Sequence, residues 1–298
     1  MEKRVLGKTG MQVSVLGFGG AEIGYEHASQ ETVDKLLDAA LNEGLNAIDT
    51  AECYVTSEEM IGKSVSGRRK DFFLFTKCGH ADSFYNPAWS KTDIEKSLDR
   101  SLKNLKTDYV DLLQLHSCSK AILEKGEVVE ALEKAKKAGK TRFIGYSGDS
   151  EDALHAIKMD VFDTLQTSVS IFDQECLELT LPLAREKNMG VIAKRPIGNA
   201  VWRFPERPDN SYVVEYWERM RALGYQFGNG KPEAFGEMAL RFTYSVPGVH
   251  TMIVGTKVPG RWKENAQVLA QGLLSEKEME AITSAWKSVA KRTWVGQV

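Results

Sequence analysis

The sequence predicts an α/β fold, and in particular a closed (β/α)8 TIM barrel. The chain has 298 residues, of which 42% are hydrophobic, so it is long enough to bury the core of one barrel domain. Eight short β-branched or aromatic runs alternate with longer amphipathic stretches, which is typical of repeated βα units. These runs are almost continuously apolar, as expected for strands buried on both faces. Periodicity alone leaves an open doubly wound sheet as the alternative.

The chain begins with two short strands before the repeated units. Arg4–Leu6 and Gln12–Ser14 flank a Lys-Thr-Gly turn, so we expect a β-hairpin that caps the bottom of the barrel. The eight barrel strands are then expected at Val15–Gly17, Ala47–Asp49, Phe72–Lys77, Val110–His116, Arg142–Ser147, Thr164–Val169, Val191–Arg195 and Met252–Gly255.

Between the strands, apolar residues recur at three- and four-residue steps, which predicts helices. The expected helices are Glu31–Asn42, Asp93–Leu105, Ala121–Ala138, Asp152–Lys158, Leu177–Lys187, Glu233–Tyr244 and Arg261–Ala270. Gly44, Gly139 and Gly190 each follow a helix and precede a strand, where a residue that tolerates positive φ can end the helix. An additional C-terminal helix, Ser275–Lys291, begins with a Ser-Glu-Lys-Glu cap and is followed by Trp294, which we expect near the barrel top.

We expect residues 1–298 to form a single domain, with one long segment after strand seven. Residues 198–231 contain several aromatic side chains, including Trp202, Trp217 and Tyr225. Two interpretations remain open for this segment. It is either a loop that covers the substrate, or a helical insertion around Val214–Leu223 that packs on the outside.

Composition excludes several classes of partner. The net charge is −2 and the basic residues are spread along the chain, which disfavours nucleic acid. Apolar stretches fall far short of the roughly 20 residues needed to cross a bilayer, and the N-terminus lacks the apolar region of a secretory signal. We therefore expect a cytoplasmic protein, a monomer or weak homo-oligomer, that acts on a small molecule. Its four cysteines form no CxxC pair, so neither a metal site nor a disulfide framework is expected.

Polar residues end three successive predicted strands. Asp49, Lys77 and His116 each follow an apolar run, and Tyr54 lies five residues beyond Asp49. The carboxyl ends of barrel strands converge on one mouth, so these four side chains are expected to meet there. A buried aspartate or lysine is costly unless paired, so Asp49 and Lys77 are expected to neutralise each other.

Each residue taken singly also has a purely structural explanation. Asp49 could cap a helix, Tyr54 could be a half-buried loop aromatic, Lys77 could extend along the barrel rim and His116 could be a hydrogen-bonded core histidine. Together, however, they supply an acid, an activating cation and a neutral hydrogen-bond donor, which favours a catalytic set.

Several segments resemble the aldo/keto reductase family, in order and over nearly the whole chain. Residues 6–10 and 15–20 are similar to that family's hairpin and first strand. Residues 46–54, with Ser57 and Glu58 behind them, resemble its aspartate and tyrosine segment. Phe75-Thr76-Lys77 and residues 111–116 resemble its lysine and histidine segments. The resemblance implies an enzyme that moves a hydride between NADP(H) and a small aldehyde or ketone.

The resemblance also implies roles for the four residues. Tyr54 would be the general acid in reduction and the base in oxidation, while His116 would donate a hydrogen bond to the carbonyl oxygen. A free tyrosine, with a pKa near 10, is a weak acid. We therefore expect the Lys77 ammonium to lower the pKa of Tyr54, and Asp49 to keep Lys77 charged and oriented.

The resemblance assigns the nicotinamide end of the cofactor to Asp49, Ser147 and Gln166. This chain departs from the family at two places. Gly148-Asp149 stands where the family commonly has an asparagine after the serine, which leaves one amide contact open. At the end of strand seven, Lys194 and Arg195 stand where many members carry a stacking aromatic residue. Either one could stack on the nicotinamide or contact the pyrophosphate.

The adenosine-phosphate end resembles the segment after strand eight. Its residues are Gly255, Thr256, Lys257, Arg261, Glu264 and Asn265. Helix N-termini favour anions, and Lys257 and Arg261 could pair with a ribose 2′-phosphate, which favours NADP. If this is only a basic helix start on the surface, NAD stays possible.

Parts of the sequence are also compatible with three other functions. A nucleotide-binding sensor or partner subunit with weak or no turnover uses the same fold, but does not need the four-residue set. A hydrolase with Asp49 and Asp149 as an acid/base pair gives no role to Lys77 or Tyr54. A Cys-His nucleophile is suggested by Cys53, Cys78 and Cys118 near the mouth, but no third orienting group is evident.

Overall fold

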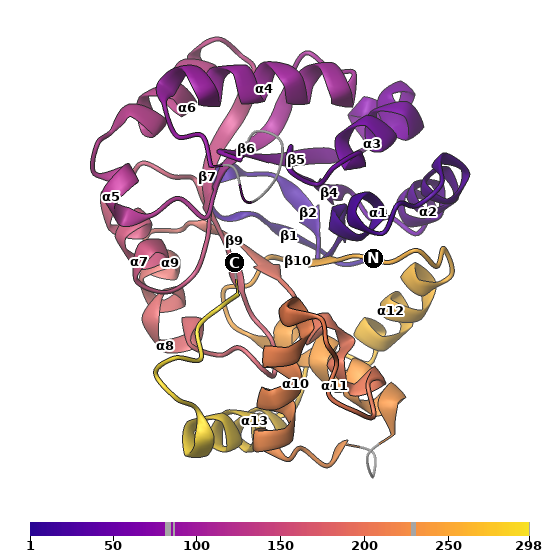
Figure 1. Cartoon of the computed structure of the whole chain (residues 1–298). Helices are drawn as coiled ribbons and strands as arrows, with labels where there is room; N and C mark the ends of the chain where they lie inside the picture. The colour runs from indigo at the N-terminus through magenta and orange to yellow at the C-terminus, as the bar shows by residue number, and fades with distance from the viewer. Residues whose placement is uncertain (81–84, 86, 228–230, 298) are drawn as a thin grey trace.

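The computed structural model describes residues 1–80, 85, 87–227 and 231–297, and its centre is a closed barrel of eight parallel strands (Figure 1). The strands run in the order β10-β3-β4-β5-β6-β7-β8-β9, and β9 pairs with β10 to close the ring. The predicted barrel is therefore confirmed over the open sheet. Its strands are β3 (Leu16–Gly19), β4 (Ala47–Asp49), β5 (Phe73–Cys78), β6 (Val110–His116), β7 (Thr141–Ser147), β8 (Thr164–Ser168), β9 (Gly190–Lys194) and β10 (Thr251–Val254).

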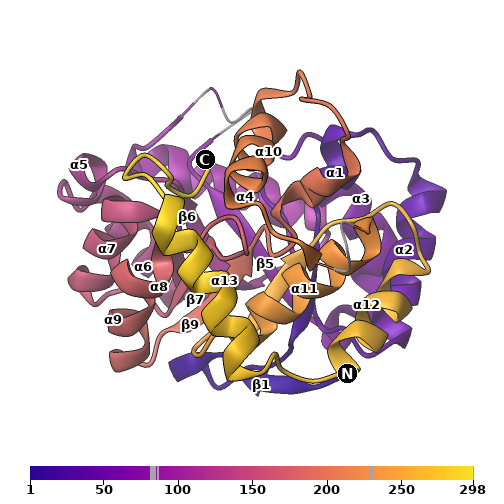
Figure 2. The same ribbon diagram turned by 90° about the horizontal axis from the view of Figure 1, so that it is seen from below.

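The predicted hairpin lies at the end of the barrel where the strands begin (Figure 2). It consists of β1 (Lys3–Val5), the short helix η1 (Gly7–Thr9) and β2 (Gln12–Ser14), with β1 and β2 antiparallel. Leu6, Met11 and Val13 are buried against apolar side chains of the barrel interior. The hairpin therefore caps the bottom and leaves the carboxyl ends of the strands to form the functional mouth.

Helices surround the barrel, and most of the predicted ranges match one of these helices to within two residues at each end. They are α1 (Ala21–Tyr25), α2 (Gln30–Asn42), α3 (Ser57–Val65), η2 (Ser66–Asp71), α4 (Lys91–Leu105), α5 (Lys120–Leu123), α6 (Glu127–Lys137), α7 (Ser150–Met159), α8 (Cys176–Leu179), α9 (Leu181–Glu186), η3 (Gly198–Arg203), α10 (Ser211–Leu223), α11 (Pro232–Ser245), α12 (Arg261–Ala270) and α13 (Glu276–Val289).

Three details of the predicted helices were wrong. The range Leu177–Lys187 is two helices, α8 and α9, which Thr180 separates. The range Ala121–Ala138 is two helices, because Gly126 adopts a left-handed conformation with φ 80° between α5 and α6. Gly190 does not end a helix. Asn188 takes the positive φ there, whereas Gly190 starts β9 and packs closely against Leu6. The stops at Gly44 and Gly139 are confirmed, with φ of 85° and 73°.

The segment after β9 contains helix α10, which confirms the helical interpretation of residues 198–231 over their described part. Tyr216, Arg219 and Leu223 of α10 are buried, and the helix packs against α13 and η3. Its first turn also reaches the mouth, since Tyr212 contacts Arg195 at the end of β9. The insertion is thus helical and borders the site at the same time.

The C-terminal helix and tail return to the barrel top. Ser275 and Glu278 form the predicted capping box of α13. Trp294 packs against Trp286, with ring centroids 5.4 Å apart, and Gly296 is buried against the Asp149 carboxylate. In Figure 1 the yellow segment after α13 runs back towards the ring of strands. The tail therefore forms part of the wall of the mouth.

Glu58, on α3, gives the fold a testable pH dependence. Its carboxylate is buried and accepts a hydrogen bond of 2.6 Å from the Thr76 hydroxyl, and burial raises the pKa of Glu58 to about 7. Between about pH 4.5 and 7 the folded chain holds a proton that the unfolded chain has lost, so stability falls as pH rises through this window.

Glu58→Gln mimics the protonated acid. We expect it to be more stable than wild type at pH 8, by up to about 3 kcal/mol, and equal to it near pH 4.5. Urea unfolding at the two pH values measures the difference. A stability difference between variant and wild type that is the same at both pH values would contradict the raised pKa of Glu58.

Candidate active site

The predicted pairing of Asp49 and Lys77 is present at the mouth. The Lys77 Nζ lies 2.5 Å from Asp49 Oδ2, and the two side chains are only 2% and 4% exposed. Lys77 also donates to the Thr50 carbonyl at 2.9 Å and approaches the Tyr54 hydroxyl at 3.4 Å. Gln114, from β6, donates to the other Asp49 oxygen at 3.4 Å. One connected polar unit is thus formed by Asp49, Lys77 and Tyr54, which come from the end of β4, the end of β5 and the loop after β4.

His116 completes the set from the end of β6. Its ring packs edge-on against Tyr54, with centroids 5.7 Å apart, and its Nδ1 lies 3.4 Å from the Cys53 Sγ. The backbone carbonyl of His116 accepts a hydrogen bond of 2.8 Å from Nε2 of His80. All four predicted residues therefore meet in one place.

The pKa of Tyr54 is shifted in the direction opposite to the one that the sequence analysis expects. Burial, reinforced by the Asp49 carboxylate, raises the pKa of Tyr54 well above its usual value, so the expected lowering by Lys77 does not prevail. Burial also raises the pKa of Asp49, against the attraction of Lys77. Burial and the Lys77 charge hold the pKa of His116 well below 6.5. Tyr54 and His116 are thus both neutral at pH 7, and Tyr54 carries the proton that an acid must donate.

The ends of β7 and β8 place the predicted carboxamide residues together. The Ser147 hydroxyl donates to Gln166 Oε1 at 3.0 Å, and Gln166 also contributes to the environment of the Asp49 carboxylate. Asp149 has a different role. It accepts hydrogen bonds from the backbone and hydroxyl of Ser168, and lies 2.8 Å from the Lys194 Nζ. Asp149 therefore joins the ends of β7, β8 and β9. Its partners among the described interactions differ from those of Asp49, which gives no support to the acid/base pair of the hydrolase hypothesis.

Lys194 and Arg195 bind different side chains. Lys194 is held by Asp149, whereas Arg195 donates to the Ser168 hydroxyl at 2.9 Å and to the Tyr212 hydroxyl at 2.7 Å. Arg195 also adopts a positive φ of 55°, which turns it away from the direction of β9. The Arg195 guanidinium also lies over the Tyr212 ring, with its central carbon 5.2 Å from the ring centroid.

The segment after β10 brings the adenosine-phosphate candidates to the start of α12. Lys257 pairs with Glu26 at 2.5 Å, and Arg261 pairs with Glu264 on its own helix. Gly255 lies against the Glu22 carboxyl so closely that any larger residue would overlap it. Thr256 accepts a hydrogen bond from the Val258 backbone, and Asn265 follows Glu264 on α12. An anion that binds Lys257 or Arg261 must compete with these carboxylates.

Two tyrosines of the mouth, Tyr25 and Tyr212, are absent from the sequence prediction of the site, which considers Cys53 only as a nucleophile. Tyr25 packs against Tyr54, with centroids 5.6 Å apart, and its hydroxyl donates to the Cys53 carbonyl. Tyr212 bonds Arg195, and Cys53 contacts His116. Position in the sequence could have indicated Tyr25 and Cys53 as residues of the mouth, because Tyr25 follows the first barrel strand and Cys53 directly precedes Tyr54. Only the fold shows that α10 brings Tyr212 to the same place.

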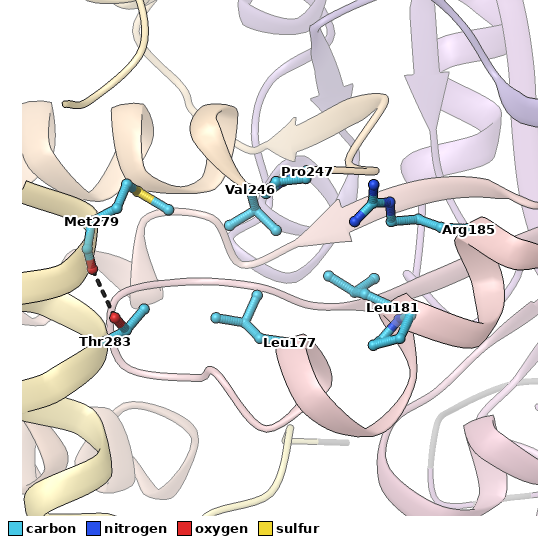
Figure 3. Close-up of a pocket in the computed structure, with 8 residues that line it drawn as sticks. Leu177, Leu181, Arg185, Val246, Pro247, Met279 and Thr283 are labelled. Carbon is cyan, nitrogen blue, oxygen red and sulfur yellow. Dashed lines mark hydrogen bonds between the residues drawn. The ribbon is translucent and has the colours of Figure 1, made fainter. Parts of the chain in front are cut away.

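A separate hollow lies on the outer helical layer (Figure 3). Apolar side chains of α8, α9 and α13 and the segment before β10 line it, among them Leu177, Leu181, Val246 and Met279. None of the catalytic candidates borders it. Across the described ranges, no group of His, Cys, Asp or Glu side chains is arranged to hold a metal ion, and no helix is both long and apolar enough to span a bilayer.

Comparisons with known proteins agree with this geometry. The model of the aldo/keto reductase family matches residues 15–287. An uncharacterised oxidoreductase of Bacillus subtilis, YqkF, is 29% identical, with 96% of this chain and 97% of YqkF aligned. L-galactose dehydrogenase of Arabidopsis thaliana is 27% identical over 99% of this chain and 97% of its own.

Among solved structures, the holo form of the aldo-keto reductase AKR11C1 from Bacillus halodurans superposes with a TM-score of 0.84, at 26% identity and over 99% of both chains. The shared features are the closed barrel, its N-terminal hairpin and nearly the full length. The chain therefore belongs to the aldo/keto reductase family and is an NAD(P)H-dependent oxidoreductase.

Proposed function

We propose that this protein is a single-domain enzyme that reduces small aldehydes or ketones with NADPH, with Tyr54 as the proton donor. The observation that carries the proposal is the connected unit of Asp49, Lys77 and Tyr54 beside a neutral His116. A nucleotide sensor would not need a buried ion pair held against a tyrosine hydroxyl, because burying two charges is costly.

The residues present fit the cofactor. Ser147 and Gln166 offer a hydroxyl and an amide to a carboxamide, and Arg195 offers a positive charge directly after β9. Lys257 and Arg261 place two positive charges at the start of α12, where an anion is favoured. When bound, NADPH supplies the hydride that reduces the carbonyl carbon. Gly255, Thr256, Glu264 and Asn265 are proposed to line the adenosine end.

The protein's own part of the reaction is to orient the carbonyl and deliver a proton. Tyr54 and His116 are proposed to donate hydrogen bonds to the carbonyl oxygen, where negative charge develops in the transition state. Tyr54 then gives its proton to that oxygen. The nearby Lys77 ammonium stabilises the phenolate left behind, and Asp49 holds Lys77 in place. In the oxidative direction, the phenolate takes the proton back.

The first test is turnover. NADPH oxidation is followed at the nicotinamide absorbance with a panel of small aldehydes, ketones and aldoses. The aldoses are included because the Arabidopsis relative carries the name of a sugar dehydrogenase. We expect reduction of at least one class. Tight NADPH binding without turnover over the whole panel would instead favour the sensor hypothesis.

Cofactor preference gives a separate prediction. Arg261→Ala removes a cation proposed to bind the 2′-phosphate, so we expect the Kd for NADPH to rise by about tenfold, with little change for NADH. Lys263→Ala on the same helix is the matched control and should leave both values unchanged. Equal weakening of NADPH and NADH in Arg261→Ala would contradict a 2′-phosphate role.

A further inference from the structure

Cys53 lies at the mouth, and the proposed mechanism gives it no role. It lies between Glu52 and Tyr54 in the loop after β4, and its side chain is buried. Its Sγ lies 3.4 Å from Nδ1 of His116. The thiol therefore contacts the ring nitrogen of a residue that the mechanism uses as a donor.

The protonation state of the thiol limits what this contact can be. Burial raises the pKa of Cys53 to about 12, so at neutral pH the group is an S–H and not a thiolate. A nucleophilic Cys-His pair requires the thiolate, which excludes that hypothesis for Cys53. The remaining possibility is a hydrogen bond between a neutral thiol and a neutral ring.

A neutral imidazole carries one proton on two nitrogens, so the partner of Nδ1 decides the state of Nε2. If the Cys53 S–H donates to Nδ1, then Nε2 is protonated and can donate to a carbonyl oxygen. If Nδ1 donates to sulfur, Nε2 presents a lone pair, which a carbonyl oxygen would repel.

The other cysteines show how buried thiols are used in this chain. Cys78 donates to the Gln114 carbonyl at 3.4 Å, Cys118 to the Ser119 carbonyl at 3.7 Å and Cys176 to the Ser168 carbonyl at 3.1 Å. Each of these thiols acts as a donor to an acceptor that carries no proton. A deprotonated Nδ1 is the equivalent acceptor for Cys53.

We propose that Cys53 is a positioning residue whose thiol donates to Nδ1 of His116 and holds the ring as the tautomer protonated on Nε2. His116 is then fixed in the form that donates a hydrogen bond into the mouth. The catalytic consequence rests on the proposed function, whereas the tautomer itself can be measured without any substrate.

The direct test is ¹⁵N NMR of the histidine rings in the wild-type protein at pH 7. The signals of His116 are identified by their loss in His116→Gln. We expect Nδ1 to have the shift of an unprotonated nitrogen that accepts a hydrogen bond, and Nε2 that of a protonated one. In Cys53→Val, the Nδ1 signal should move away from this position, and in Cys53→Ser the hydroxyl should return it towards the wild-type value.

The kinetic test uses the same variants with a carbonyl substrate found in the panel. We expect kcat/KM to fall by about five- to tenfold in Cys53→Val and to stay within about twofold of wild type in Cys53→Ser, with the NADPH Kd unchanged in both. Cys118→Val is the matched control, because among the described interactions its buried thiol bonds only the Ser119 carbonyl and no catalytic group; it should keep the wild-type kcat/KM.

The outcomes separate this inference from the proposed function. A wild-type ring protonated on Nδ1, or an unchanged Nδ1 signal in Cys53→Val, would overturn the tautomer assignment even in an active reductase. A shifted signal with unchanged kcat/KM would overturn its catalytic role. Absence of turnover in the wild type would count against the proposed function, and the NMR result would stand by itself.

Discussion

Replacing Tyr54 by phenylalanine is expected to lower kcat by about 10²- to 10⁴-fold, the usual contribution of a positioned general acid. Phenylalanine keeps the ring that packs against Tyr25 and His116 and removes only the hydroxyl beside Lys77. The pKa of Tyr54 is raised by burial, so the wild-type hydroxyl stays protonated throughout the neutral range. Stopped-flow measurement of NADPH oxidation at saturating cofactor isolates the chemical step.

Tyr25→Phe is the matched control for this variant. The Tyr25 hydroxyl donates to the Cys53 carbonyl and has no contact with Lys77 among the described interactions, so its removal should change kcat by less than about tenfold. An active Tyr54→Phe enzyme with wild-type kcat would remove Tyr54 from the mechanism and leave His116 as the candidate donor.

Lys77→Met is expected to be costly for both activity and stability. The variant leaves the buried Asp49 carboxylate without its cation, which typically destabilises a protein by about 3–5 kcal/mol. Without Lys77, the pKa of Asp49 rises further, so the loss of stability grows as pH increases above the usual carboxyl pKa. Urea unfolding at pH 5 and pH 8, together with kcat, measures both effects.

The double variant Asp49→Asn/Lys77→Met separates the two roles of the pair. It contains no unpaired buried charge, so we expect it to recover at least half of the lost stability while kcat stays low. Recovery of activity together with stability would show that the pair serves folding alone. A single variant as stable as wild type at both pH values would mean that Asp49 and Lys77 are not paired in solution.

The barrel was predictable because its strands are buried on both faces and therefore carry almost uninterrupted apolar runs. The sequence also identifies Asp49, Lys77 and His116, because each is a polar residue at the end of such an apolar run. Their convergence follows from the fold, because parallel strands of a barrel end at the same rim. The family resemblance and the geometry lead to the same four residues.

The parts that escaped prediction depend on contacts between distant segments. No local pattern shows that Tyr212 reaches Arg195, or that Gly296 lies against Asp149, because α10 and the tail reach the mouth through tertiary packing. The pKa of Tyr54 was mispredicted for a related reason. Its direction depends on whether burial outweighs the Lys77 charge, and burial is a property of the folded chain.

The central claim is that hydride and proton both reach a carbonyl at this mouth, the proton from Tyr54. The most direct measurement is deuterium transfer from C4-deuterated NADPH into the product alcohol, followed by mass spectrometry for wild type and Tyr54→Phe. We predict labelled alcohol from wild type, and at least about a hundredfold slower labelling by the variant at equal NADPH binding. Wild-type protein that binds NADPH but labels no alcohol, or a variant that labels it equally fast, would contradict the claim.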